Sequence, residues 1–407
     1  MHAPPTPLAR LLHPVPLEVF LQEYWERRPL LLPHHAPDYF SSLFSQEELE
    51  ALLWSANLGW GEVQLANHRR GQGWVDATRH PPSLDRLARA HAQGDTVILN
   101  DVQLRSRPVA RLCRDLEALF NHVVNVNMYL TPRGAQGLAP HFDTQDVFIL
   151  QIRGSKHWKL SAPCVPLPHE GLGRELTPDD PREPLLTAHL RAGDVLYMPR
   201  GVIHEALTAD DESLHLTVGV NVLTWSLLLE EVLRAASDQD VESRRALPPG
   251  FLSREELLPR LREGLEALLG RLSASLPVEE GVERLARRYL SRLHPLPDED
   301  LRHAQDAGTV DLETRVRRRA GMFCRVHAGD GTVRIDFPGG SVEGPAPLEP
   351  ALRFVAREEE FAVGELPGGL SEKTRLILAR RLLSEGLLRE ARAPSRSDSA
   401  GTPRPGE

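Results

Sequence analysis

The chain has 407 residues and a formal net charge of −9, with 41% hydrophobic and 26% charged residues. The length predicts two or three domains with a real core, and the composition is that of a globular protein rather than a fibrous or disordered one. The acidic balance gives no electrostatic reason to expect a general binder of nucleic acid or of anionic membranes.

The cysteines and the N-terminal residues help to predict the cellular compartment of the protein. The three cysteines, Cys113, Cys164 and Cys324, are far apart and suggest neither a disulfide framework nor a thiolate zinc site. Residues 1–12 lack the charged start and apolar run of a signal peptide. No segment has the roughly 18 uninterrupted apolar residues needed to cross a bilayer. The sequence therefore predicts a cytoplasmic protein.

Helical and β-type patterns alternate along the first half of the chain. Residues 16–55 have helical periodicity, and Ser45-Gln46-Glu47-Glu48 opens one helix with a capping-box pattern. A further helix is predicted at 109–120. Short apolar strands, separated by Gly and Pro turns, are predicted at 96–99, 123–130, 147–152, 156–160, 195–199 and 214–222. That spacing predicts an all-β barrel or sandwich with helices packed outside it.

The second half has a different texture. Residues 223–305 show leucine-rich helical spacing and predict a helical unit. Residues 306–392 contain a basic run, two strands with a turn at Gly329-Asp330-Gly331, and a helix at 372–385 that begins after Ser371 and ends before Gly386. This order predicts a small winged-helix-like module. The tail, 393–407, is rich in Ser, Pro, Gly and charge and is predicted to be disordered.

Three residues form a candidate metal site. His141 and Asp143 would point to the same side of a strand, because strand residues two apart share a face. His204 follows a strand and a Pro-Arg-Gly turn, 63 residues after His141. Two imidazoles and a carboxylate leave three open positions on an octahedral ion, as in non-haem Fe(II) oxygenases, whereas zinc more often has three or four closed ligands. His-x-Asp alone is a weak motif, so the alternative is three isolated polar residues.

Lys156 sharpens this hypothesis. It is one of three lysines among 45 arginines, and it follows a turn at Gly154-Ser155 that would return the chain beside the ligand strand. A lysine inside a barrel is costly unless it meets an anion, which a dicarboxylate cosubstrate would provide; the alternative is a lysine on the solvent face. Asn127 and Tyr129 alternate on an earlier strand and could hydrogen-bond carboxylate oxygens, or could be buried structural residues.

Several segments together resemble the JmjC-type ribosomal oxygenases, which hydroxylate histidine or arginine side chains of ribosomal proteins. They are Glu23-Tyr24-Trp25-Glu26-Arg27-Arg28-Pro29-Leu30, Tyr129-Leu130-Thr131-Pro132, Pro140-His141-Phe142-Asp143, Gly154-Ser155-Lys156-His157-Trp158, Gly193-Asp194-Val195-Leu196-Tyr197-Met198-Pro199-Arg200-Gly201, Ser213-Leu214-His215-Leu216-Thr217 and Arg244-Arg245-Ala246-Leu247-Pro248. They span roughly residues 17–250 and are far more specific together than singly.

The resemblance implies an α+β fold with three ordered parts. A double-stranded β-helix (JmjC/cupin) core with flanking helices would occupy residues 1–222. A helical dimerisation region would follow at 223–305, and a C-terminal winged-helix-like domain at 306–392.

The resemblance also implies roles for the candidate residues. Fe(II) would be bound by His141, Asp143 and His204. Lys156 and Tyr129 would hold the distal carboxylate of 2-oxoglutarate, and Asn127 would lie near its metal-chelating end. The reaction would consume O2 and 2-oxoglutarate, release succinate and hydroxylate a protein side chain, with histidine and arginine both open as targets. One departure is Gly219, where some relatives carry a small hydroxyl residue.

Two other readings stay open. The same core could act on a small molecule or a non-ribosomal protein, since a barrel does not fix its substrate, although the accessory helices favour a macromolecule. Alternatively, a non-catalytic chain could bind nucleic acid through the winged helix. Residues 311–392 have 14 Lys and Arg against 13 Asp and Glu, which offers no strong phosphate-binding field, and the cluster of Arg315, Arg317, Arg318 and Arg319 is more typical of a solvated helix face. We expect a homodimer acting on a ribosomal protein, without direct nucleic-acid or membrane partners.

Overall fold

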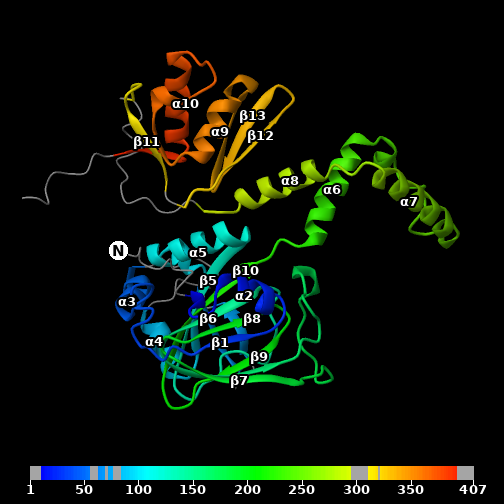
Figure 1. Ribbon diagram of the computed structural model, residues 1–407. Helices are drawn as coiled ribbons and strands as arrows, with labels where there is room; N and C mark the ends of the chain where they lie inside the picture. Colours follow the sequence, from blue (N-terminus) through cyan, green and yellow to red (C-terminus); the bar gives the residue numbers. More distant parts are fainter. Residues whose placement is uncertain are drawn as a thin grey trace, which may run out of the picture. The chain divides into compact units, whose positions relative to one another are not determined.

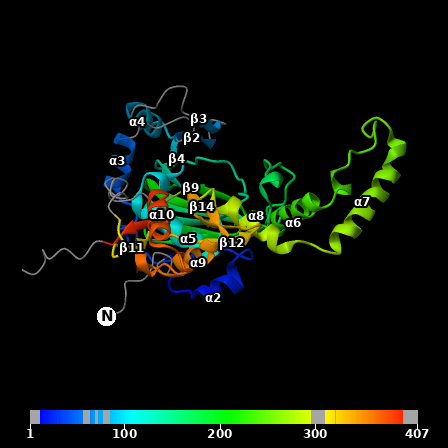
Figure 2. The same cartoon turned by 90° about the horizontal axis from the view of Figure 1, so that it is seen from above.

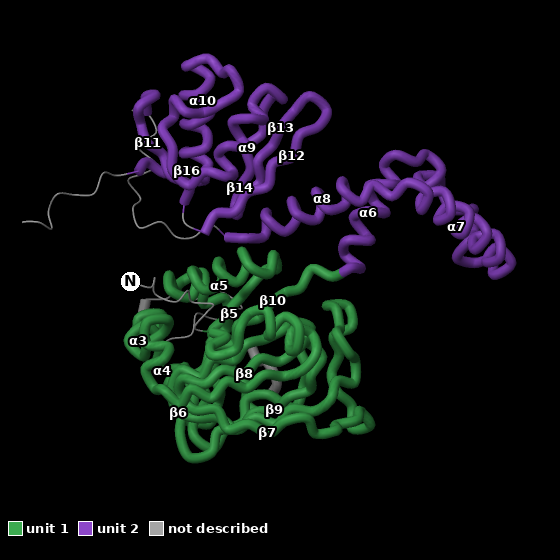
Figure 3. Tube along the Cα trace, viewed as in Figure 1, with its two compact units in different colours: residues 1–224 green, residues 225–407 purple. Residues whose placement is uncertain are grey.

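The computed structural model describes residues 11–55, 63–68, 72–76, 84–294, 310–319 and 321–391. The chain divides into two compact units, residues 1–224 and 225–407 (Figure 3). Residues 1–10 and the tail predicted to be disordered, 393–407, lie outside the described residues. No helix in the described part of the chain is long and apolar enough to cross a membrane.

The first unit is built on a ten-stranded sheet whose described pairings are all antiparallel (Figure 1). Its strands are β1 (Leu30–Leu32), β2 (Val63–Asn67), β3 (Gln72–Asp76), β4 (Thr96–Leu99), β5 (Val123–Thr131), β6 (Asp146–Ser161), β7 (Pro184–Arg191), β8 (Val195–Met198), β9 (Ile203–Leu207) and β10 (Ser213–Asn221). The main order is β1-β8-β6-β10-β5-β4-β2-β3, and β7 and β9 also pair with β6.

Strand β6 bends and so belongs to two parts of this sheet. Residues up to Gly154 pair with β8 and β10, whereas residues from Ser155 onward pair with β7 and β9. Gly154 has a φ of +66°, and a Cβ there would lie 1.7 Å from the carbonyl oxygen of Glu212, so the bend requires glycine. The two separate strands predicted at 147–152 and 156–160 are therefore one strand, and the turn predicted before Lys156 is wrong.

Apolar and polar residues alternate along β5 and β10, so each strand has one face in the core and one polar face. The main core takes every second side chain: Val124, Val126 and Met128 from β5, and Leu214, Leu216, Val218 and Val220 from β10. The intervening residues, which include Asn127, Tyr129 and His215, point to the opposite face because strand side chains alternate. The strands predicted at 96–99, 123–130, 195–199 and 214–222 are confirmed within one residue at each end, and the polar residues of β5 and β10 share one side.

Helices pack against the apolar face of the sheet. They are α2 (Leu17–Val19), the π-helical turn η1 (Phe20–Tyr24), α3 (Gln46–Ser55), α4 (Leu84–Ala92) and α5 (Arg107–Phe120), with the 3-10 turn η3 (Val102–Leu104). A second 3-10 turn, η4 (Glu170–Leu172), is exposed. Ser45 caps α3, since its Oγ accepts from Glu48 N–H at 3.2 Å. Leu112 and Leu116 of α5 lie in the same core as the apolar residues of β5. The predicted helices outside a β core are confirmed.

The second unit begins with three helices. They are α6 (Trp225–Gln239), α7 (Leu258–Ser273) and α8 (Val278–Leu290), with 3-10 turns η5 (Glu242–Arg244) and η6 (Glu255–Leu257). Gly281 lets α8 approach α6 closely, because a Cβ there would lie 2.3 Å from Val232 Cγ2. Helix α7 extends away from α8 and the C-terminal sheets (Figures 1 and 2), and every residue in it is at least partly exposed.

Residues 310–391 form two three-stranded sheets with two main helices. The sheets have the orders β15-β11-β16 and β12-β13-β14. The elements are β11 (Arg315–Arg318), β12 (Arg325–Gly329), β13 (Thr332–Phe337), β14 (Gly340–Pro345), η9 (Ala346–Leu348), α9 (Glu349–Arg357), β15 (Glu360–Ala362), η10 (Val363–Glu365), α10 (Glu372–Ser384) and β16 (Leu388–Glu390). The hairpin turn and the last helix lie where they are predicted.

The arginine cluster of this region differs from its prediction. It forms strand β11 rather than a helix face, with Val316 fully buried between neighbouring arginines. Arg315 and Arg317 both pair with Glu360 on β15, at 2.9 and 2.7 Å. Arginine and valine alternate in this segment, and such alternation predicts a strand rather than a helix.

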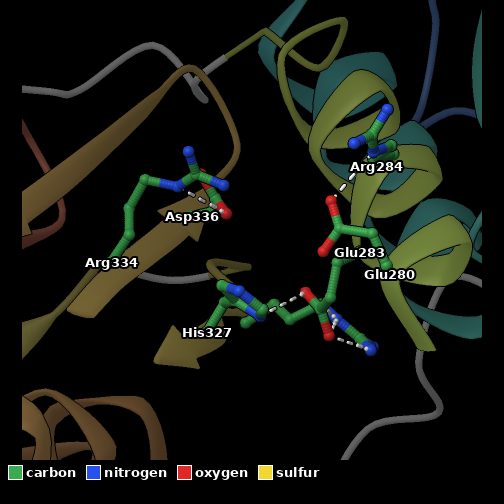
Figure 4. A network of polar contacts seen from close by, with 7 residues as sticks. Glu280, Glu283, Arg284, His327, Arg334 and Asp336 are labelled. Atoms are coloured by element: carbon green, nitrogen blue, oxygen red, sulfur yellow. Dashed lines mark hydrogen bonds and ion pairs between the residues drawn. The ribbon is translucent and has the colours of Figure 1, made fainter. Parts of the chain in front are cut away.

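Ion pairs join α8 to the neighbouring hairpin within the second unit (Figure 4). Glu283 of α8 accepts from Arg325 Nε at 2.9 Å and from Arg325 Nη2 at 2.6 Å, and His327 Nδ1 lies 3.9 Å away. Burial acts to raise the pKa of Glu283, but the hydrogen bonds and charge of Arg325 outweigh it and lower the pKa. Helix α8 is therefore attached to β12 by a charge-assisted contact.

Candidate active site

The structure brings His141, Asp143 and His204 together. Each offers one ligand atom, and these atoms all lie within 4.8 Å of one another. His204 Nε2 is 3.6 Å from Asp143 Oδ2, and the centroids of the two imidazoles are 4.3 Å apart. Two imidazoles and a carboxylate at this spacing could hold one metal ion and leave positions open for other ligands.

Backbone pairing, rather than one strand, assembles this group. His141 and Asp143 lie in an irregular segment before β6, so their predicted placement on a strand is wrong. His141 N–H donates to His204 O at 3.1 Å, and His204 N–H returns a bond to His141 O at 2.8 Å. Gly201 N–H also donates to Asp143 O at 2.9 Å. The three side chains meet because these bonds join two distant segments.

Carbonyl oxygens orient both imidazoles. His141 Nδ1 lies 2.8 Å from Ala139 O, and His204 Nδ1 lies 3.1 Å from Val202 O. A carbonyl oxygen can only accept, so each neutral ring carries its proton on Nδ1 and keeps a lone pair on Nε2. Burial, and next the nearby His141, lower the pKa of His204 to about 4. His204 is therefore a neutral ring at physiological pH, in the tautomer that a metal requires.

A pocket lies beside these three residues. It contains about 510 Å³ of empty space, part of it open to solvent. Its walls are formed by Thr96, Tyr129, Gly137, Leu138, His141, Asp143, Ile149, Lys156, Trp158, His204, Ala206, His215 and Thr217. The Trp158 ring is 6.1 Å from the His204 ring and 5.8 Å from Lys156 Nζ. Trp158 is therefore a neighbour of both His204 and the lysine.

Lys156 faces this pocket and not the solvent. Its side chain is only 4% exposed, and its Nζ donates to Thr131 Oγ1 at 3.0 Å. Among the described residues, no carboxylate forms an ion pair with it, and burial lowers its pKa to about 7. A buried ammonium without an anion is costly, so an anionic ligand entering the pocket would gain a strong interaction.

Tyr129 and Asn127 have different positions relative to the pocket. Tyr129 lines it, stacks on His215 with centroids 4.9 Å apart, and has a pKa raised by burial. Asn127 is not among the lining residues; its Oδ1 accepts from Asp101 N–H at 3.2 Å, and its side chain hydrogen-bonds Tyr129. A direct contact between Asn127 and a ligand stays a prediction.

Thr217 is a pocket hydroxyl that is not predicted from the sequence as a site residue. It lies opposite Asn127 on β5 and Ile149 on β6, so its side chain shares their face. Gly219, two residues later, packs against an amide cluster, and a Cβ there would meet Gln145 Oε1 at 2.4 Å. The hydroxyl absent at position 219 is thus present two residues earlier on the same face, and counting in steps of two from Gly219 is the signal that could find it.

Trp158 and His215 are further pocket residues whose role is not predicted from the sequence. Trp158 Nε1 and His215 Nδ1 are buried and have no hydrogen-bond partner within the described part of the chain. Burial, and then the charge of Lys156, lower the pKa of His215 well below its usual value. Unpartnered buried polar atoms are rare in native proteins, so these two, next to an unpaired lysine, fit a pocket that receives a polar anion.

Comparisons with known proteins identify the class. Residues 100–228 match the family model of the JmjC domain. Several structures of Escherichia coli YcfD, a ribosomal oxygenase, share the fold, and the one with cobalt and 2-oxoglutarate has a TM-score of 0.55 at 20% identity over 92% of this chain and 98% of that chain. The chain is therefore a JmjC-domain protein with a cupin-like fold.

Sequence relatives narrow the class further. The chain is 34% identical over 299 residues to the bifunctional lysine-specific demethylase and histidyl-hydroxylase NO66 of Branchiostoma floridae, covering 69% of this chain and 46% of the relative. It is 31% identical over 303 residues to ribosomal oxygenase 1 of Homo sapiens, with 69% and 46% covered. The chain spans about half the length of these relatives. It belongs to the JmjC-domain ribosomal oxygenase family, as its motifs predict.

Proposed function

We propose that this chain is an Fe(II)- and 2-oxoglutarate-dependent dioxygenase that hydroxylates a protein side chain. The observation that carries the proposal is the group of two imidazoles and a carboxylate beside a pocket that buries an unpaired lysine. In this proposal His141, Asp143 and His204 bind the iron. Bound iron, 2-oxoglutarate and O2 supply the oxidising chemistry and yield succinate, while the protein supplies geometry and a sheltered pocket.

The side chains of the pocket would bind and orient the cosubstrate. Lys156 and Tyr129 would hold its distal carboxylate, with Trp158 Nε1 and His215 Nδ1 available as further hydrogen-bond donors. Asn127 would act from beside Tyr129, near the metal-chelating end. A bound carboxylate would give Lys156 a charged partner and Trp158 Nε1 and His215 Nδ1 a hydrogen-bond partner, so the binding energy comes from groups already in place.

A ribosomal protein is the proposed substrate, with histidine or arginine as the target residue. The names of the relatives support this, because they include a histidyl-hydroxylase and ribosomal oxygenases. Mass spectrometry of ribosomal proteins from cells with and without the gene should show one residue that lacks one oxygen when the gene is absent. Succinate formation by the purified protein, with no ribosomal protein modified, would instead favour a small-molecule or non-ribosomal substrate. A cytoplasmic location is part of the same proposal.

Proton uptake is expected when 2-oxoglutarate binds above pH 7. Without a bound anion, burial holds the pKa of Lys156 at about 7, so the amine is mostly neutral at pH 8. A bound carboxylate favours the ammonium form and raises this pKa. The affinity should therefore fall by up to about tenfold per pH unit above 7 and be flat below it.

Calorimetry can measure this proton. The Mn(II)-loaded protein is titrated with 2-oxoglutarate at pH 8 in two buffers with different ionisation enthalpies, and the difference gives the number of protons bound. Lys156→Arg is the matched control, because arginine stays charged and should bind the anion without taking up a proton. Equal enthalpies in both buffers for the wild-type protein would contradict the expectation.

We also propose that residues 223–305 form a homodimerisation region and residues 306–392 a winged-helix-like domain. Exposed apolar side chains support the first part: Trp225 is 86% and Leu252 88% exposed, and α7 exposes Leu265 and Leu269. Neighbouring exposed apolar side chains often mark protein–protein contacts, whereas scattered ones are ordinary, so the pair on α7 carries most of this support. The pairing of Arg315 and Arg317 with Glu360 leaves less free positive charge for phosphates, in line with a domain that does not bind nucleic acid directly.

The dimer proposal predicts a change of mass in solution. Leu265 and Leu269 lie one turn apart on α7 and would share one apolar face. The double variant Leu265→Asp/Leu269→Asp should be a monomer by light scattering after gel filtration, while the wild-type protein is a dimer. Glu263→Lys, on the opposite face of the same helix, should leave the dimer unchanged. A wild-type monomer, or a double variant that stays dimeric, would reject this role for α7.

A further inference from the structure

A buried carboxylate links the two chain segments that carry the candidate metal ligands. Asp146 opens β6, three residues after Asp143, and is fully buried. Its Oδ1 accepts from Tyr197 Oη at 2.8 Å, and its Oδ2 accepts from Arg200 Nη1 at 2.8 Å. Tyr197 lies on β8 and Arg200 in the turn that leads to His204. One carboxylate is thus bound to both halves of the site.

The N-terminal segment completes this network from the other side. Arg200, whose side chain is 5% exposed, also pairs with Glu26 Oε1 at 2.5 Å. Glu26 N–H donates to Tyr197 Oη at 3.0 Å, and Glu26 holds a φ of +57°, a conformation that non-glycine residues seldom adopt without a specific reason. Trp25 stacks on Phe120 at 4.6 Å and so anchors the segment. The Glu23–Leu30 segment, one of the motifs in the sequence, is therefore joined to Arg200.

The turn after Arg200 has little freedom to move. Gly201 has a φ of +86°, and a Cβ there would lie 2.4 Å from Val165 O. Its N–H donates to Asp143 O. A buried ion pair adds little stability by itself, but removing one partner leaves a buried charge unmatched and the neighbouring backbone must rearrange. Any such rearrangement would act directly on the carbonyl of Asp143.

We infer that Arg200 is a positioning residue of the metal site, which acts with Asp146, Tyr197 and Glu26 to hold the His141-Asp143 segment against His204. This rests on the proposed function, because it takes those three residues as the metal ligands. Arg200 does not line the pocket, so it touches neither the metal nor the cosubstrate. Its effect passes through the geometry of the ligands, and its loss should change metal binding beyond any change in stability.

Cobalt binding to the full-length protein tests this inference. Titration with Co(II) gives the affinity, the visible absorption of bound Co(II) reports the ligand geometry, and thermal unfolding without metal gives the stability. Arg200→Met should weaken Co(II) binding by about 10- to 100-fold, the range for residues that orient metal ligands, and should shift the spectrum. Arg200→Lys, which keeps the charge, should recover part of the affinity. Arg153→Met, which removes an exposed partner of Glu212 from β6, the strand that also carries Asp146, should bind Co(II) like the wild-type protein.

A double variant separates positioning from stability. Asp146→Asn/Arg200→Met removes both buried charges, so it should unfold at a higher temperature than Arg200→Met yet still bind Co(II) weakly. Recovery of both stability and Co(II) affinity would reject a positioning role, as would wild-type affinity and spectrum in Arg200→Met. A wild-type protein that does not bind Co(II) at all would instead overturn the proposed function.

Discussion

Alanine at His141 or Asp143 is expected to abolish metal-dependent succinate formation. Each substitution would leave only two of the three proposed protein ligands, whose ligand atoms lie within 4.8 Å of one another. Without a correctly held metal there is no oxidising centre, so turnover should fall by several orders of magnitude, to the uncatalysed background. The measurement is succinate released by purified protein with Fe(II), 2-oxoglutarate and a ribosomal protein extract.

The control for this experiment is a histidine on the outer face of β6, the strand that follows the His141-Asp143 segment. His157 follows Lys156 but is exposed and stacks on His189 at 4.0 Å, so His157→Ala should keep normal turnover. Thermal unfolding establishes that each variant is folded. A folded His141→Ala or Asp143→Ala protein with normal succinate formation would show that these residues do not hold the metal.

The three candidate ligands could be picked out from the sequence, but the way they are brought together could not. His141, Asp143 and His204 are recognisable from residue type and from a turn that precedes the last of them. Their meeting depends on paired hydrogen bonds between His141 and His204, a contact across 63 residues that no local pattern contains. The strand predicted for the first two is an irregular segment because this long-range bridge, rather than β periodicity, orients them.

Two other predictions from the sequence are wrong: the turn at Gly154 and the helix face at the arginine cluster. Gly154 predicts a turn by composition, whereas the strand continues through it with a bend, since the neighbouring strands β7 and β9 supply hydrogen bonds on the far side. The arginine cluster predicts a helix face by charge, whereas the buried Val316 and the partner Glu360 make it a strand. In both cases tertiary pairing outweighs the local preference.

Some pocket residues could likewise be predicted from the sequence, and others could not. Lys156 stands out because lysine is rare in this chain, and the structure buries it as the barrel hypothesis requires. Trp158 and His215 do not stand out, because an aromatic residue in a strand is ordinary core. Only their unpartnered nitrogen atoms mark them, and hydrogen-bond satisfaction is a property of the folded chain that sequence patterns do not show.

Lys156→Ala is expected to weaken 2-oxoglutarate binding by about 2 to 4 kcal/mol, because a buried carboxylate would lose its charged partner. That corresponds to about 30- to 1000-fold in affinity. Metal binding should be unchanged, since Lys156 Nζ contacts Thr131 and not the candidate ligands. Lys159→Ala is the matched control: this lysine lies on the same strand but is 71% exposed and only 3.8 Å from Glu205, so its loss should have no effect.

The stability of the folded protein provides a second, independent test of the role of Lys156. Its pKa falls from 10.5 to about 7 on burial, so between these values the unfolded chain binds more protons than the folded one, and the folded state without an anion gains stability as the pH rises. Lys156→Met removes this penalty. At pH 7.5 it should unfold at a higher temperature than the wild-type protein without 2-oxoglutarate, and should gain little when the cosubstrate is added. Equal stabilisation of both proteins by 2-oxoglutarate would place the carboxylate away from Lys156.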